Sequence, residues 1–290
     1  MSDKLTVLTV ATGNDGYLPI LKDQLEKGGV NYKIIGYGEK WRGWTWRTNK
    51  MMKYIRDNHD PDDVIMVVDG YDILFVGDEQ SVMKKYRSFD TEVVFGVGLN
   101  DSVDYSYLAH YVTFPIERSY FKATDRYMKN GGSYMGTARS LLKLYRRLKK
   151  FCKKTGNKDD QLALNNMSLN DIPHKLDTKG EIFWIWHPNG PSEFMSMLVN
   201  GQYPGIVEGF EMKDERPEFP NGVKPEVIHG IGHRDMSVVI GSDFKCKHRE
   251  IVQGDLYYTL YLIKALIIIL PLLLFYLFYY RRSNRTVSSE

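Results

Sequence analysis

Two aspartates lie three positions apart in V-V-D-G-Y-D, residues 67–72, directly after an apolar run. Side chains three apart on a continuing strand point to opposite faces, so Asp69 and Asp72 converge only where the chain turns, which Gly70 permits. A buried carboxylate without a partner is costly, so the pair indicates a bound cation or a satisfied turn. Convergent oxygens suit Mn²⁺ or Mg²⁺ held against a diphosphate; on this motif alone, an Asx-type turn without an ion is the alternative.

Aromatic and basic side chains lie together in G-Y-G-E-K-W-R-G-W-T-W, residues 36–46. In such a loop the Trp41 ring can stack on a nucleobase and Arg42 can pair with a phosphate. The alternative is that the three tryptophans pack against one another in an outer loop. Farther along, Asn130 opens N-G-G-S-Y-M-G, a predicted glycine turn in which the backbone can approach a ligand closely.

Two further sites carry acid–base or metal-binding side chains. Asp159 and Asp160 open a predicted helix, where capping is their usual role, although adjacent acids can also bind sugar hydroxyls or act as a base. His229 follows a short predicted strand and precedes glycines, so it can give one nitrogen to a metal or fill a purely structural role.

The elements that position these residues follow an alternating pattern. Apolar strands are predicted over 5–11, 32–37 and 64–68, with helices over 18–27 and 48–59 between them. Continuous apolar strands separated by helices are typical of a parallel sheet covered on both faces, the doubly wound α/β class. Ligands bind beyond the carboxyl ends of such strands, where Asp69 and Asp72 lie. Later segments predict strands over 93–97 and 226–228, helices over 140–150 and 159–167, and an irregular stretch over 190–224.

The composition limits the size of the core, the kind of partner and the use of the cysteines. The 290 residues are 43% hydrophobic and 26% charged, which is enough for one large core, and residues 1–250 are predicted to form it. The net charge of +3 gives no strong field for polyanions, so we expect no nucleic-acid partner. Two cysteines without a C-x-x-C pair exclude a zinc ribbon and a disulfide framework built from them.

Residues 256–280 form an apolar and aromatic segment followed by a short basic tail, residues 281–290. Its length and its tyrosines at both ends predict a transmembrane helix, with Lys264 within reach of one interface. We therefore expect a single-pass C-terminal membrane anchor. The N-terminus does not resemble a signal peptide, so a cytosolic catalytic domain is the default and the lumenal orientation stays open.

The order of the motifs resembles a known family. The series A-T-G-N-D-G-Y, G-Y-G-E-K-W-R-G, V-V-D-G-Y-D-I-L-F, N-G-G-S-Y-M-G, D-D-Q-L, L-D-T-K-G-E-I-F and H-G-I-G is similar to the glycosyltransferase domain of procollagen lysyl hydroxylases and to procollagen glycosyltransferases. The resemblance covers residues 5–235. It implies a GT-A fold, with a mostly parallel central sheet and helices on both faces, that uses Mn²⁺ and a UDP-sugar.

The resemblance also implies roles for particular residues. The family's metal ligands match Asp69, Asp72 and His229, and its acidic residues implicated in sugar transfer match Asp159 and Asp160. Its donor-binding residues match a set spread along the chain: Trp41 and Tyr71 at the uridine, Lys50, Asn130, and Gly232 in H-G-I-G. We expect Lys50 or Arg47 to approach the phosphate.

The chain departs from the family pattern in three places. W-T-W-R-T-N-K, residues 44–50, replaces a run of glycines, and the acidic run is shortened to two aspartates preceded by Lys158. After His229 the family's lysine is missing, and Arg234 lies one position from its place. These differences affect the phosphate contacts and the identity of the acceptor.

The sequence thus predicts a metal-dependent transferase that moves galactose or glucose from a UDP-sugar to a hydroxyl acceptor, either hydroxylysine in a collagen-like protein or a glycan. Two rivals stay open. One is a membrane-tethered nucleotide-sugar-binding protein without transferase activity, and the other is a metal-dependent phosphohydrolase, which also needs clustered acids.

Overall fold

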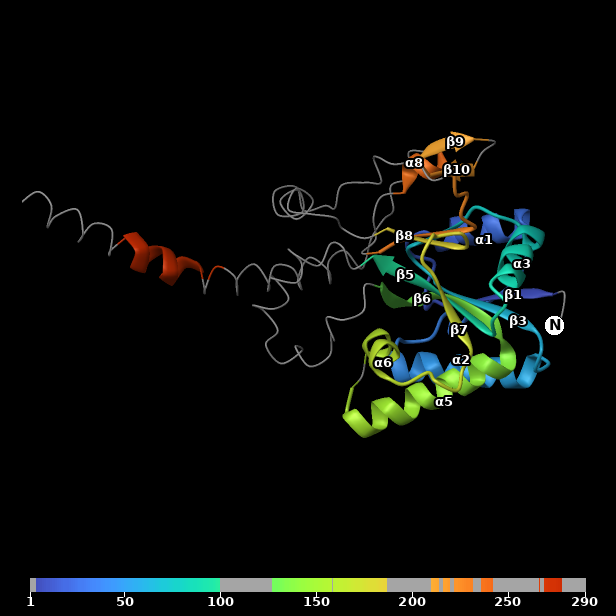
Figure 1. Ribbon diagram of the computed structural model, residues 1–290, viewed down its shortest axis with the longest axis horizontal. Helices are drawn as coiled ribbons and strands as arrows, with labels where there is room; N and C mark the ends of the chain where they lie inside the picture. The colour runs from blue at the N-terminus through green and yellow to red at the C-terminus, as the bar shows by residue number, and fades with distance from the viewer. Residues whose placement is uncertain are drawn as a thin grey trace, which may run out of the picture.

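The computed structural model describes residues 4–99, 127–157, 159–186, 210–213, 216–219, 222–231, 236–241, 266 and 269–277. A central sheet with helices on both faces dominates this part of the chain (Figure 1). The prediction of an α/β fold with a mostly parallel sheet is therefore confirmed, and the fold is consistent with the GT-A class.

The central sheet has six strands in the order β2-β1-β3-β6-β5-β7. Strand β1 pairs in parallel with β2 and β3, and β5 pairs in parallel with β7, whereas β6 runs antiparallel to both β3 and β5. The strands are β1 (Leu5–Val10), β2 (Asn31–Ile35), β3 (Val64–Asp69), β5 (Val93–Leu99), β6 (Tyr127–Thr137) and β7 (His174–Asp177).

Helices cover each face of this sheet and bury its apolar side chains. On one face, α1 (Leu18–Lys27) and α3 (Glu79–Ser88) enclose a core that includes alternate residues of β1 and β3. On the other face lie α2 (Trp44–Asn58), α5 (Ala138–Thr155) and α6 (Asp160–Asn166) (Figure 1). Both faces of β3 are buried from Val64 to Val68, which explains why this part of its sequence is continuously apolar and not alternating.

Two helices start earlier than their sequence patterns indicate. Helix α2 begins at Trp44, so the tryptophan cluster belongs in part to its first turn and not to a loop. Helix α5 begins after Thr137, whose side chain accepts a hydrogen bond from the backbone N–H of Ser140 and caps the helix. These boundaries place Arg47 inside α2, where its side chain is buried.

A second, three-stranded sheet lies at the end of the central one. It has the order β4-β11-β8, formed by β4 (Ile73–Phe75), β11 (Val227–Gly230) and β8 (Phe183–Trp186). The strand predicted over 226–228 is confirmed as β11, but its antiparallel pairing with β4 was not predicted. This pairing sets His229 opposite Ile73, and the Gly230 N–H donates to the Asp72 carbonyl at 2.9 Å.

The start of β11 is held by a buried acid. Glu226 has no exposed side-chain surface, and it forms ion pairs with Lys85 and with Arg216, the latter at 2.8 Å. Ser81 also donates to it at 2.6 Å. Because a buried carboxylate is stable only when it is paired, these contacts fix the position from which β11 carries His229 toward β4.

Two sequence predictions are wrong. The N-G-G-S-Y-M-G segment is not a glycine turn but part of β6, in register with β3 and β5. Glycines occur in this strand because neighbours occupy the space of their side chains: a Cβ on Gly136 would lie 2.6 Å from the Glu92 carbonyl oxygen. The stretch 190–224, predicted to be irregular, contains the hairpin of β9 (Glu211–Lys213) and β10 (Arg216–Glu218), and helix α8 (Ser237–Ile240) follows.

The predicted membrane helix over 256–280 is described only at residues 266 and 269–277, which are helical with exposed side chains. Among the described residues, no helix combines the length and the apolar character needed to cross a membrane. The rest of the predicted span, the basic tail, Gly232 and Arg234 lie outside the described residues.

Candidate metal and sugar-donor site

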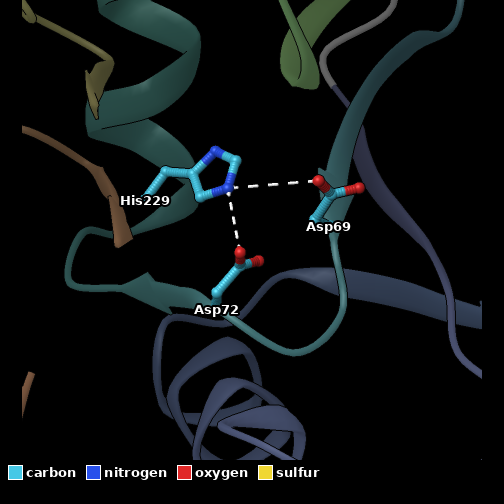
Figure 2. A group of neighbouring side chains, drawn as sticks. All are labelled: Asp69, Asp72 and His229. Atoms are coloured by element: carbon cyan, nitrogen blue, oxygen red, sulfur yellow. Dashed lines mark ion pairs between the residues drawn. The ribbon is translucent and has the colours of Figure 1, made fainter. Parts of the chain in front are cut away.

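Three side chains from separate segments converge at the rim of the central sheet. Asp69, Asp72 and His229 each offer one ligand atom, and these atoms all lie within 4.8 Å of one another. Figure 2 shows the two carboxylates facing the same ring nitrogen. His229 Nε2 lies 3.4 Å from Asp72 Oδ2 and 4.0 Å from Asp69 Oδ2. The structure therefore brings together the three residues that were predicted as metal ligands.

The turn between the two aspartates is fixed by Tyr71. Its hydroxyl accepts hydrogen bonds from the backbone N–H groups of Thr12 at 2.7 Å and Gly13 at 3.1 Å. Its carbonyl accepts from the Tyr17 N–H at 2.9 Å. These contacts tie the end of β3 to the loop after β1, so both carboxylates point to one side. A contact between Tyr71 and uridine stays a prediction.

His229 is buried and oriented by a second partner. Its Nδ1 lies 3.0 Å from the Ser133 hydroxyl on β6, which leaves Nε2 toward the carboxylates. A histidine that donates from one nitrogen presents a fixed lone pair on the other, as metal-binding histidines do. Burial disfavours the charged ring, but the carboxylates of Asp72 and Asp69 outweigh it and raise the pKa of His229. The position thus favours positive charge.

Gly132 makes room for the Asp69 carboxylate. Strand β6 pairs with β3 through Ser133 and Val68, which brings Gly132 against the last residue of β3. A Cβ on Gly132 would lie 2.0 Å from Asp69 Oδ2, closer than nonbonded atoms can approach. Asn130 shapes the same segment, because its Oδ1 accepts from the Gly132 N–H at 2.8 Å. Asn130 is therefore connected to the metal group through the backbone.

A Gly132→Ala substitution is expected to weaken Mn²⁺ binding by about tenfold or more, because the added methyl displaces a ligand carboxylate. Titration calorimetry with Mn²⁺ measures the effect. Gly131→Ala is the matched control on the same strand, since its Cβ would meet the Gln161 Cβ at 3.3 Å, the Gln161 Cα at 3.5 Å and Asp160 Oδ1 at 3.7 Å, and none of these atoms belongs to the metal group. Equal Mn²⁺ affinity in the Gly132 variant and the natural protein would contradict the assigned position of Asp69.

An arginine from α2 lies directly behind the metal group. The buried Arg47 places Nη2 2.7 Å from Asp69 Oδ1 and Nη1 3.7 Å from Asp160 Oδ2. Arg47 was predicted as an alternative phosphate ligand, but the structure pairs it with these two carboxylates. Burial raises the pKa of Asp160 to about 6, against the opposing effect of Arg47. The guanidinium thus links Asp69 to the first residue of α6.

The adjacent acids Asp159 and Asp160 have different surroundings. Asp159 is exposed and accepts a hydrogen bond from the Leu162 N–H at 3.0 Å, so it caps α6 as the capping alternative predicted. Asp160 is the member of the pair that faces Arg47, with 12% of its side chain exposed. Of the two acids, Asp160 is therefore the one that is connected to the metal group through Arg47.

Two of the residues predicted at the sugar nucleotide, Trp41 and Lys50, lie near the start of α2. Trp41 is exposed, and its ring meets those of Trp44 and Trp46 edge to face at 5.2 and 5.5 Å. Lys50 pairs with Glu39 at 2.6 Å. One side of α2 borders a pocket of about 500 Å³ lined by Arg42, Thr45, Trp46, Asn49, Lys50 and Lys53.

Comparisons with known proteins show the family to which the chain belongs. The chain matches the family model of the PLOD GT domain over residues 1–197. It is 26% identical over 252 residues to the multifunctional procollagen lysine hydroxylase and glycosyltransferase of Caenorhabditis elegans, in a match that covers 79% of this chain and 30% of that protein. The corresponding human protein, LH3, is 26% identical over 249 residues, with 79% of this chain and 30% of LH3 covered. The chain thus spans under a third of the length of these relatives.

A solved structure, a glycosyltransferase involved in glycosylation of the major capsid of PBCV-1, has a TM-score of 0.43 and 9% sequence identity, covering 79% of this chain and 93% of its own. The assignment of a family rests on the sequence comparisons alone. The family model covers 197 of the 290 residues, including β3, the turn with Asp72, Arg47 and α6. The chain therefore belongs to the family of PLOD glycosyltransferase domains.

Proposed function

We propose that this chain is a metal-dependent glycosyltransferase that moves a hexose, galactose or glucose, from a UDP-sugar to a hydroxyl acceptor. The observation that carries the proposal is the convergence of Asp69, Asp72 and His229 within 4.8 Å. Membership of the family supplies the class of reaction, and the geometry supplies a place where a diphosphate and its cation can be held together.

The residues present fit a divalent cation. Two carboxylate oxygens and one imidazole nitrogen suit Mn²⁺ or Mg²⁺, and the Ser133 contact leaves Nε2 of His229 available. Gly132 leaves space that the Asp69 carboxylate fills. When bound, the cation would neutralise negative charge on the UDP leaving group. Asp69, Asp72 and His229 are the residues that would hold it.

The protein's own side chains then have separate tasks. Arg47 and the Tyr71 turn hold the carboxylates in place. Trp41 offers an exposed ring on which the uracil can stack, and Lys50 lies on the adjoining helix for a phosphate. Asp160 is the acid placed to orient a sugar hydroxyl or to accept the proton of the acceptor hydroxyl.

The proposed acceptor is based on the names of the related proteins. The names of the relatives pair lysine hydroxylation of procollagen with glycosyl transfer. We therefore propose hydroxylysine in a collagen-like protein as the first acceptor to test, with a glycan hydroxyl as the second. The predicted anchor over 256–280 would tether this reaction to a membrane and stays a prediction.

The test is a turnover assay with UDP-galactose and UDP-glucose in Mn²⁺, without and with a hydroxylysine peptide. We expect UDP release from one donor and a peptide one hexose heavier by mass spectrometry. Inorganic phosphate or UMP as the product would instead identify a phosphohydrolase. UDP binding by calorimetry with the donor left intact under every condition would identify the rival without transferase activity.

The binding-only rival has one observation in its favour. In the structure, Arg47 takes an oxygen of Asp69, one of the ligands on which the cation depends. The segment that contains Arg47, residues 44–50, is also where the chain departs from its family's glycines. The same assay separates the two functions, because only a transferase releases UDP from the donor.

A further inference from the structure

A buried arginine, Arg47, pairs with one of the residues of the metal group. Arg47 has 4% of its side chain exposed, and its Nη2 lies 2.7 Å from Asp69 Oδ1. The other Asp69 oxygen, Oδ2, faces His229 at 4.0 Å. The two oxygens of the Asp69 carboxylate thus face different partners. The same Nη2 donates to the Gly131 carbonyl at 3.4 Å, which fixes the guanidinium against β6.

Two consequences follow for any ion held by Asp69. Because Oδ1 is paired with Arg47 and Oδ2 faces His229, Oδ2 is the oxygen through which Asp69 would hold an ion. The positive charge of Arg47 also acts on a divalent cation at close range, in a buried setting where solvent screens little. Arg47 therefore opposes the binding of the ion while it holds one of the ligands in position.

The same charge has the opposite effect on a nucleoside diphosphate. An anion beside the metal group is attracted by Arg47, whose positive charge offsets part of the negative charge of the Asp69 and Asp160 carboxylates. A guanidinium is also always charged, so its effect does not vary across the working pH range. The charge of Arg47 thus acts against a free metal ion and in favour of a metal ion that is bound to phosphates.

We propose that Arg47 is a positioning residue that holds Asp69 in one-oxygen ligation, weakens the binding of free Mn²⁺ and strengthens the binding of UDP. This inference rests on the proposed function, since it assumes that metal and diphosphate share the site. It goes beyond that function by assigning opposite effects on two ligands to one side chain.

The test measures the two affinities separately in the full chain. Titration calorimetry gives the Mn²⁺ affinity without nucleotide and the UDP affinity at saturating Mn²⁺. For Arg47→Gln we expect Mn²⁺ to bind about tenfold more tightly and UDP about tenfold more weakly, typical coupling factors for charges that share a site. Arg47→Lys keeps the positive charge, and we expect both affinities to change less than they do in Arg47→Gln.

Controls separate this role from a structural one. Arg56→Gln makes the same change on an exposed part of α2, where Arg56 pairs with Asp57, and should change neither affinity. Should Arg47→Gln fail to fold, the double variant Arg47→Gln/Asp160→Asn removes both charges of the Arg47–Asp160 pair. It is compared with Asp160→Asn alone, and the same two opposite shifts are expected.

The outcomes are distinct. A variant in which both ligands bind more weakly would show a purely structural role and overturn the inference, while the proposed function would stand. Unchanged affinities in Arg47→Gln would overturn it equally. If the natural protein binds neither Mn²⁺ nor UDP, the proposed function fails first and the role of Arg47 fails with it.

Discussion

Asp72→Asn is expected to lower turnover of the UDP-sugar in Mn²⁺ by about a hundredfold or more. The substitution keeps the shape of the side chain and removes the charge that faces His229 Nε2 at 3.4 Å. Only two carboxylates belong to the three-residue metal group, so one loss removes half of its negative charge. The measurement is UDP release under saturating donor, with the metal concentration varied.

The fold should survive this change, because Asp72 lies at the rim of the sheet and its backbone contact to Gly230 is unaffected. Asp62→Asn is the matched control, an exposed aspartate paired with Arg139. It should leave turnover within about twofold, as surface ion pairs contribute little. Turnover by the Asp72 variant equal to that of the control would reject the assigned metal group.

Asp160→Asn is expected to reduce kcat by about a hundredfold while leaving the KM for the UDP-sugar within about threefold. This split arises because Asp160 is assigned to the acceptor or to a sugar hydroxyl and not to the nucleotide. Burial makes Asp160 suited to this role, because it raises the pKa of Asp160 to about 6 even though Arg47 acts in the opposite direction. Steady-state kinetics with the acceptor found in the product assay give both constants.

The neighbouring residue provides a close control. Asp159→Asn changes an identical group one position earlier, and asparagine caps helices as well as aspartate does. We therefore expect normal kcat and an unchanged thermal midpoint from the Asp159 variant. A loss of kcat in Asp159→Asn that matches the loss in Asp160→Asn would contradict the proposal that Asp159 caps the helix while Asp160 takes part in the reaction.

The sequence predicted those parts of the fold that depend on local patterns. Strand β3 is apolar from Val64 to Val68 because both of its faces are buried there, and such a run can be recognised in the residues themselves. Helix α1 was predicted with its observed bounds, since Gly28 and Gly29 mark its end. The metal group was predicted through the resemblance, and the structure confirms that its three members converge.

Features set by long-range contacts were missed. Strand β6 was taken for a turn because its glycines favour turns locally, whereas their real cause is the close approach of Asp69, at the end of β3, and of Glu92, which directly precedes β5. The pairing of β11 with β4 joins residues far apart in sequence, and no local pattern specifies it. The role of Arg47 was hidden for the same reason, since an arginine in a helix is usually exposed.

One departure from local expectation did carry a signal. Arginine at position 47 lies one turn before Met51 and two turns before Ile55, both buried on the face of α2 that packs on the sheet. A charged residue on an otherwise apolar helix face requires a buried partner, and Asp69, at the end of β3, is the acid that pairs with it. The helical spacing of Arg47, Met51 and Ile55 is therefore the feature of the sequence that indicates a buried arginine.

The most direct test is a crystal structure of the full chain with Mn²⁺ and UDP, with the ion located by its anomalous signal. The account predicts a single peak about 2.0–2.3 Å from Asp69 Oδ2, an Asp72 oxygen and His229 Nε2, next to the diphosphate. A peak elsewhere on the protein, or UDP bound with no ion between its phosphates and these three side chains, would contradict it.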